Sequence, residues 1–122
     1  MKAERRVNRS ENTMKSLVYQ LAATAERAAC SALVLTEKSG LVVAEVGDDP
    51  AAEEIAAYAP CLARGGLRWH GMIPTSSGER LVTITPLASE SGALFLCAVG
   101  GQFCVLGSEL LLSGRGIVRI LS

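Results

Sequence analysis

The sequence predicts an α+β fold, within the broader α/β class, with the element order α-β-β-α-β-β-β-α and a five-stranded antiparallel sheet that carries helices on both faces. Three observations predict it. Residues 31–47 have the pattern of a β-hairpin, alanine-rich helical segments precede and follow that hairpin, and turn clusters divide residues 67–99 into three short strand candidates. A chain of 122 residues with this pattern predicts one domain around a single core.

The hairpin consists of two apolar, β-branched runs, residues 32–36 and 41–46, that flank the tetrad Glu37-Lys38-Ser39-Gly40. Gly40 can adopt a positive φ without a Cβ penalty, which is typical of a tight turn. The first run is apolar almost throughout, and this predicts a central strand covered on both faces. The second run contains Glu45 near its end, which favours a position closer to the sheet edge.

A first helix is predicted from Ser10 or Asn12 through about Ala29, because either residue can cap a helix. Residues 1–9 are basic and almost free of apolar side chains, so we expect a flexible basic tail before a single domain at residues 10–122. The helix has an amphipathic stripe at three- and four-residue steps. Its members are Met14, Leu17, Val18, Leu21, Ala25 and Ala28.

A second helix is predicted from Pro50 to about Arg64, with Asp49 as its N-cap and Gly65-Gly66 after its end. Pro60 lies inside it and predicts a kink. The expected core side is Ile55, Tyr58, Ala59 and Leu62, whereas the opposite side carries Ala56, Ala57 and Pro60 beyond Glu53 and Glu54. Because that opposite side is poor in charge, we interpret it as a flat surface that packs on another subunit or a partner.

The second half of the chain predicts a weakly patterned strand at residues 67–73, a cleaner one at 80–87 and a central one at 93–99. Residues 104–121 carry a helical stripe that contains Gly114 and Gly116. Each of these glycines costs about 1 kcal/mol against alanine in a helix. Their presence predicts either a break or a close crossing over the first helix.

Composition excludes several function classes. Twelve basic residues balance twelve acidic ones and the pI is near 6.6, so the chain lacks the basic field that would attract a nucleic acid. The start has no secretory signal pattern, and the longest apolar stretch is far shorter than the ~20 residues of a membrane-spanning helix, so we expect a cytoplasmic protein. Four cysteines at spacings unlike a zinc site are expected to be reduced and buried: Cys30, Cys61, Cys97 and Cys104.

No catalytic constellation is visible. The sequence has no phosphate-binding loop, dinucleotide fingerprint or nucleophile elbow. The single His70 could join a cysteine, but metal sites need three or four ligands. The adjacent Glu53 and Glu54 point in different directions on a helix and cannot share a substrate. We therefore expect no catalytic residue, metal or cofactor, and a protein that is not an enzyme.

The segments ALVLTEKSGLVVAEVGD, AAEEIAAYAPCLARGG and RLVTITPLASESGALFLCAVGG resemble the roadblock family, which includes roadblock-type dynein light chains and MglB-like small-GTPase regulators. The tail SGRGIVRIL is similar to the glycine-led start of the family's last helix. The resemblance covers most of residues 14–121. It implies a sheet of five antiparallel strands with one helix on one face and two on the other.

The resemblance also implies a function. Family members form homodimers or heterodimers, extend the sheet across two subunits, pack their second helices together, and many bind Ras-like small GTPases. It implies a partner or dimer interface at Glu53, Ala56, Ala57, Pro60 and Arg64. Homodimer and heterodimer with a paralogue stay open, as do stimulation of GTP hydrolysis and scaffolding. A small-molecule-sensing module of the profilin, PAS or GAF type is the alternative, and an enzyme using a cysteine and His70 is a third.

Overall fold

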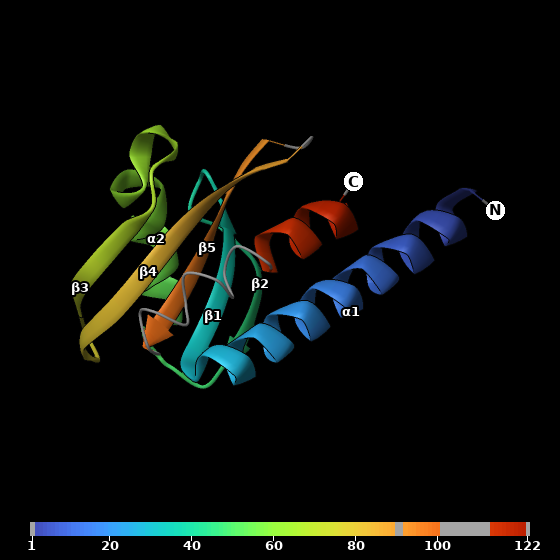
Figure 1. Ribbon diagram of the computed structural model, residues 1–122. Coiled ribbons are helices and arrows are strands. Elements are labelled where there is room, and N and C mark those ends of the chain that lie inside the picture. The colour runs from blue at the N-terminus through green and yellow to red at the C-terminus, as the bar shows by residue number, and fades with distance from the viewer. Residues whose placement is uncertain (1, 90–91, 101–112, 122) are drawn as a thin grey trace.

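The computed structural model describes residues 2–89, 92–100 and 113–121, with side chains described from residue 12 onward. A helix, a two-stranded hairpin and a second helix come before a three-stranded meander (Figure 1). The elements are α1 (Lys2–Ala28), β1 (Cys30–Glu37), β2 (Val42–Gly47), α2 (Ala52–Leu62), the 3₁₀ turn η1 (Arg64–Gly66), β3 (Trp69–Thr75), β4 (Gly78–Ser89), β5 (Gly92–Gly100) and a C-terminal helix at residues 113–121.

The five strands form one antiparallel sheet in the order β2-β1-β5-β4-β3. This confirms the predicted fold class. β1 lies between β2 and β5 and is buried from Ala32 to Thr36, as expected for a strand covered on both faces. β2 and β3 are the two edges, and Glu45 is exposed on the former.

Helices cover both faces of the sheet. α2 packs on one face over a cluster that includes Val34, Ile84 and Cys97. α1 and the C-terminal helix pack on the other face over a second cluster that includes Leu33 and Leu96 (Figure 1). Because side chains alternate along a strand, neighbouring residues of β1 contribute to opposite cores.

Helix α1 begins at Lys2, eight residues before the predicted start at Ser10. The predicted start of the first helix is therefore wrong, because the backbone of residues 2–9 is already helical. Lys, Arg, Glu and Ala fill most of those positions, and all four favour helix when packing does not decide. The division into a tail and a domain at residues 10–122 stays a prediction.

The C-terminal helix crosses close to α1. A Cβ atom built on Gly116 would lie 3.0 Å from Oε1 of Gln20 on α1, and Ile117 is fully buried beside Leu17 and Leu21. The glycine therefore marks a close crossing, one of the two predicted alternatives. The rest of the predicted helix, residues 104–112, lies outside the described residues.

The meander departs from prediction in its bounds. β3 covers residues 69–75 rather than 67–73, and β4 extends beyond the predicted 80–87 at both ends. The hairpin turn between them is only two residues long, because Thr75 pairs with Gly78.

The cysteines also differ from expectation: Cys97 is buried and Cys30 half-buried, but Cys61 is exposed, and Cys104 lies outside the described residues.

Candidate partner interface on the second helix

The start of α2 is fixed by a buried carboxylate. The helix begins at Ala52 after Ala51, which provides no side-chain cap, so the predicted N-cap Asp49 lies two residues before the N-cap position. Asp49 still makes the kind of bond that an N-cap makes, because the Ala51 N–H donates to its Oδ1 at 3.0 Å. Arg80 Nε on β4 donates to both carboxylate oxygens at 3.2 and 2.9 Å. The carboxylate thus ties the β2–α2 connection to β4.

The environment of Asp49 lowers its pKa. Burial alone raises the pKa of this carboxyl, whose side chain is 6% exposed, but the Ala51 N–H, the Arg80 guanidinium and the Ser31 hydroxyl together bring it below its ordinary value. The group is therefore held as a carboxylate.

A second contact holds the first turn of α2 against the β3–β4 turn. The Ser76 N–H donates to Glu54 Oε1 and Oε2 at 3.2 and 3.1 Å, and its hydroxyl also donates to that carboxylate. Glu54 therefore has a structural role within the subunit, whereas its neighbour Glu53 is exposed.

The inward face of α2 differs from prediction at two positions. Ile55 and Ala59 are buried as expected, but Ala56 is also fully buried, so it cannot belong to the predicted outward surface. Tyr58, predicted to face the core, is 48% exposed. The physical reason is that a helix packed closely on a sheet accommodates an alanine methyl at the contact and has no space for a tyrosine ring.

The outward face of α2 carries four of the five predicted interface residues. Glu53, Ala57 and Arg64 are exposed and Pro60 is half-buried. The β1–β2 turn borders this surface, because a Cβ atom built on Gly40 would lie 3.4 Å from the Ala57 Cα. The small side chain of Ala57 thus lies in the middle of the surface, with Glu53 and Arg64 toward its two ends. Two further exposed residues of this surface, Tyr58 and Cys61, were not predicted from the sequence. Each lies four residues after a residue that had been assigned to the outward side, Glu54 and Ala57, and residues four apart share a helix face.

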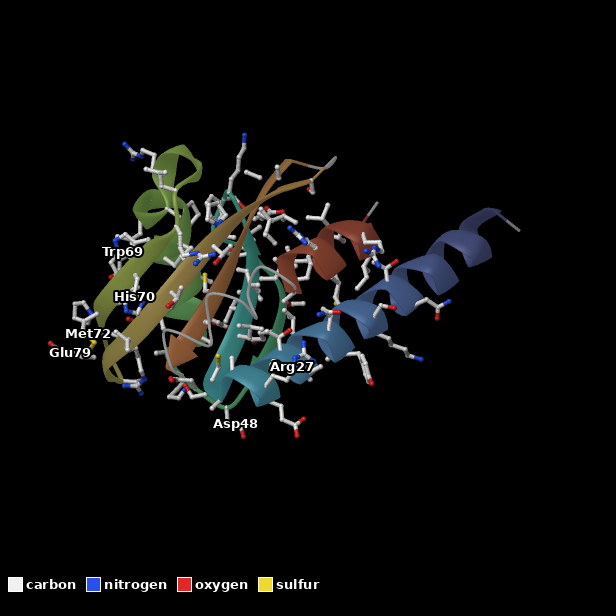
Figure 2. All side chains as sticks on the ribbon, viewed as in Figure 1. Arg27, Asp48, Trp69, His70, Met72 and Glu79 are labelled. Atoms are coloured by element: carbon white, nitrogen blue, oxygen red, sulfur yellow. The ribbon has the colours of Figure 1, made fainter. Side chains whose placement is uncertain are left out.

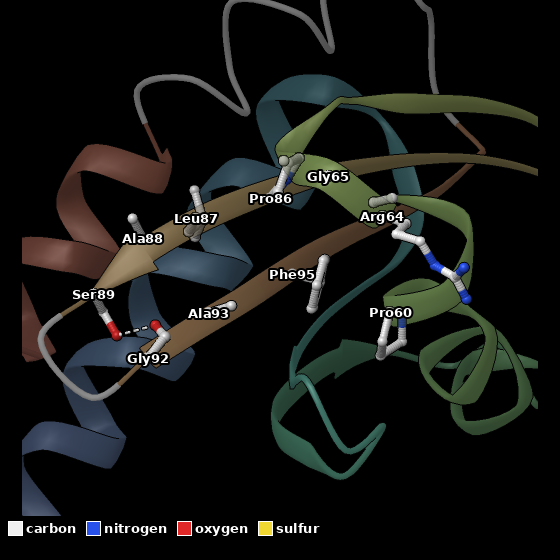
Figure 3. Close-up of a pocket in the computed structure, with 12 residues that line it drawn as sticks. Pro60, Arg64, Gly65, Pro86, Leu87, Ala88, Ser89, Gly92, Ala93 and Phe95 are labelled. Atoms are coloured by element: carbon white, nitrogen blue, oxygen red, sulfur yellow. Dashed lines mark hydrogen bonds between the residues drawn. The ribbon is translucent and has the colours of Figure 1, made fainter.

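A groove adjoins the end of this surface (Figure 3). It has a volume of about 460 Å³ and lies between the end of α2 with η1 on one side and the last residues of β4 with the first residues of β5 on the other. Among the described lining residues, Arg64 is the one that carries a charge. Apolar groups dominate the rest of its lining: Pro60, Ala63, Pro86, Leu87, Ala88, Ala93 and Phe95.

The candidates for chemistry lie apart from this surface. His70 is on β3 (Figure 2), where its Nδ1 is 2.8 Å from Thr83 Oγ1. Burial raises the pKa of the Cys97 thiol to about 12 and that of Cys30 to about 11, so neither is a ready nucleophile. In the described ranges no three His, Cys, Asp or Glu side chains are placed to share a metal ion. None of the helices described is both long and apolar enough to cross a membrane.

Comparison with known proteins finds no matching family model and no matching curated protein. Solved structures do match. The chain is similar to MglB of Myxococcus xanthus, with a TM-score of 0.66 and 10% identity over 88% of this chain and 89% of that one. A structure described as MglB with a tetrameric arrangement has a TM-score of 0.66 and 14% identity over 88% and 89%.

A third similar structure is a Roadblock/LC7 domain from Streptomyces avermitilis, with a TM-score of 0.61 and 22% identity over 85% of this chain and 96% of that one. All three comparisons cover most of both chains. This chain therefore has the roadblock fold.

Proposed function

We propose that this chain is a cytoplasmic, non-enzymatic member of the roadblock family that forms a dimer through α2 and binds a Ras-like small GTPase. The observation that carries the proposal is the outward face of α2, where the exposed Ala57 lies between the charged residues Glu53 and Arg64 and next to the exposed Tyr58. Exposed helices normally carry charge on this side. A smooth helix face that is ordered and accessible suits close packing on a second protein surface.

The charges at the two ends of this surface favour a second copy as the first partner. Glu53 lies near the start of α2 and Arg64 just beyond its end, eleven residues later and roughly 16 Å along the axis. In a two-fold symmetric pair of antiparallel helices, Glu53 of each copy faces Arg64 of the other, and Ala57 faces Pro60. The tetrameric arrangement of a similar MglB structure also supports self-association.

The likeness to MglB structures and the resemblance to a GTPase-binding family support the GTPase as the functional partner. The chain would regulate or scaffold that GTPase by positioning the partner's own switch residues. Arg64 and Arg80 are poor candidates for a transition-state arginine, because the first lies at the proposed dimer contact and the second is bound to Asp49.

Light scattering on a sizing column tests the dimer. We expect the mass of a dimer across a concentration series and a monomer for Ala57→Arg, whose long charged side chain would separate the two helices. Ala22→Arg, at an exposed position on α1 on the other face of the sheet, is the matched control and should stay dimeric. A monomeric wild-type protein, or an Ala57→Arg variant that still dimerises, would contradict the proposed interface.

Binding to GTPases is tested separately. The Ras-like GTPases of the same genome, each loaded with GDP or a non-hydrolysable GTP analogue, are passed over the immobilised protein. We expect one GTPase to bind with a preference for one nucleotide state. If none binds above background, the GTPase part of the proposal is wrong, whatever the oligomeric state.

A further inference from the structure

The sheet is incomplete at one corner. β3 pairs with β4 only as far as Trp69 opposite Ile84, whereas the pairing of β4 with β5 continues to Ser89 opposite Gly92. Among the described strands, residues 85–89 therefore have a neighbour on one side only. Before Trp69 the chain turns away through η1, and none of the strands that the structure describes occupies the position in which β3 would continue.

The register shows which backbone groups face this empty position. Two hairpin loops of two residues flank β4. One is closed by Thr75 with Gly78 and the other by Ser89 with Gly92, and such closing pairs exchange hydrogen bonds. Because these bonds alternate along a strand, even-numbered residues of β4 direct their backbone groups toward β3. Pro86 and Ala88 continue that series into the gap. A proline, which has no N–H, is tolerated where it faces an unpaired edge.

The groove described above lies at this corner. Residues 63–66 with Pro60 line one side, and residues 86–89 of β4 with Gly92, Ala93 and Phe95 of β5 line the other (Figure 3). The groove thus lies over the α2-facing side of these strand ends and borders the position that β3 leaves vacant. Its lining is mainly apolar, and the side chain of Arg64 stands at its rim (Figure 3). Arg64 is exposed and makes no hydrogen bond or ion pair with any described residue. A guanidinium in this state is available for a carboxylate.

We propose that this groove binds an extended peptide segment that carries apolar side chains and one acidic residue. The segment adds a short strand beside β4, accepting a hydrogen bond from the Ala88 N–H and donating to the carbonyls of Pro86 and Ala88. Its carboxylate pairs with Arg64. An open groove along a strand edge suits an extended chain, whereas small-molecule pockets enclose most of their ligand. This site goes beyond the proposed function, because it needs no GTPase and no second copy. It shares Pro60 and Arg64 with the proposed dimer contact, so the peptide and a second copy compete for Arg64.

The test starts from a display library of random heptapeptides selected on the immobilised full chain. We expect enrichment of sequences in which Asp or Glu adjoins apolar residues. The best peptide, labelled with fluorescein, should bind Arg64→Gln about tenfold more weakly, because a charge-assisted bond is lost. Arg119→Gln changes an exposed arginine on the other face of the sheet and should leave binding unchanged.

The strand pairing is tested by modifying the backbone of the peptide, so that the wild-type protein can be used throughout. N-methylation of alternate peptide amides should abolish binding in one register and leave it unchanged in the other. The Ala57→Arg variant, expected to be monomeric, should bind the peptide at least as tightly as the wild type, because its Arg64 no longer faces Glu53 of a second copy. Weaker binding by this variant would mean that the groove depends on the dimer. A library without enrichment, or an enriched peptide that binds Arg64→Gln and both N-methylated forms undiminished, would overturn the proposal.

Discussion

At the scale of single residues, Gly47 shows how tightly the end of the hairpin is built. Its φ is +100°, and a Cβ atom there would lie 2.3 Å from the Ser31 carbonyl oxygen and 2.7 Å from the Ala32 Cα. We predict that Gly47→Ala lowers the free energy of unfolding by at least about 2 kcal/mol, because backbone strain and overlap with main-chain atoms add. Urea unfolding followed by circular dichroism measures this.

Gly65→Ala is the matched control. Gly65 has a φ of +80°, but no atom lies within 4 Å of the position its Cβ would take. Only the backbone strain applies there, and the loss should be about 1 kcal/mol. Equal losses for the two variants would show that the contact with Ser31 and Ala32 contributes nothing.

The lowered pKa of Asp49 predicts that the free energy of unfolding depends on pH. Its pKa in the folded protein is lower than its ordinary value of 3.8, so the stabilisation is present above that value and is lost as the pH falls through the folded pKa. At pH 7 we expect Asp49→Asn to lower the free energy of unfolding by about 1 to 2 kcal/mol, because the amide can accept from Ala51 but carries no charge for Arg80.

Urea titrations at pH 7 and pH 3 check this prediction, since the difference between wild type and Asp49→Asn should narrow at the lower pH. Asp48→Asn is the neighbouring control: its carboxylate is exposed, so its effect should be small at both values. A difference that stays constant or grows on acidification would contradict the assigned role of the Asp49–Arg80 pair.

Part of the candidate interface was predictable at the residue scale. The charged residues and the proline of α2 can be assigned to its outward face from the sequence, because charged side chains avoid the core and helical spacing relates the positions to one another. Ala56 and Tyr58 could not, because alanine is common both in cores and on surfaces, and tyrosine combines an apolar ring with a polar end. Their positions follow from how closely α2 approaches the sheet, which is a property of two elements together.

At the scale of elements, the C-terminal helix offers a test of packing against helix propensity. A Cβ atom on Gly116 would meet only the side chain of Gln20, whose flexible amide can move, whereas one on Gly114 would lie 2.6 Å from a Leu87 methyl in a buried contact. We predict that Gly116→Ala raises the free energy of unfolding by roughly 0.5 to 1 kcal/mol through helix propensity.

Gly114→Ala is the comparison variant, and its gain in propensity should be offset by displacement of Leu87, which leaves it neutral or destabilised. Thermal unfolding of the two variants separates these effects. A stabilised Gly114→Ala together with a destabilised Gly116→Ala would mean that the described crossing of the C-terminal helix over α1 is wrong.

Strands were easier to identify than element ends. Alternating and continuous apolar patterns located all five strands, because burial on one or both faces leaves a direct pattern in sequence. The ends of α1 and α2 were misplaced for a different reason. Asp49 has the composition of an N-cap, but its carboxylate is engaged by Arg80 from a strand that lies far away in sequence, and local reasoning does not include such a contact.

At the scale of the whole molecule, the chain encloses two cores within 122 residues, one on each face of the sheet. β1 and β5 contribute to both, so the two helical layers depend on the same central strands. The layers themselves could be predicted, since a buried central strand requires cover on both faces. The groove could not, because it arises where β3 stops short of the end of β4 and only the register shows this.

The proposed two-fold arrangement of α2 makes a prediction for the assembly. Glu53→Arg would place two arginines together at both symmetric contacts, and we expect the dissociation constant of the dimer to rise roughly tenfold. The double variant Glu53→Arg with Arg64→Glu exchanges the charges and should restore the wild-type value, because each contact again joins opposite charges. Analytical ultracentrifugation at low ionic strength measures all three proteins. A double variant weaker than Glu53→Arg alone would show that these residues do not face each other, so the helices would have to pack in another register or direction.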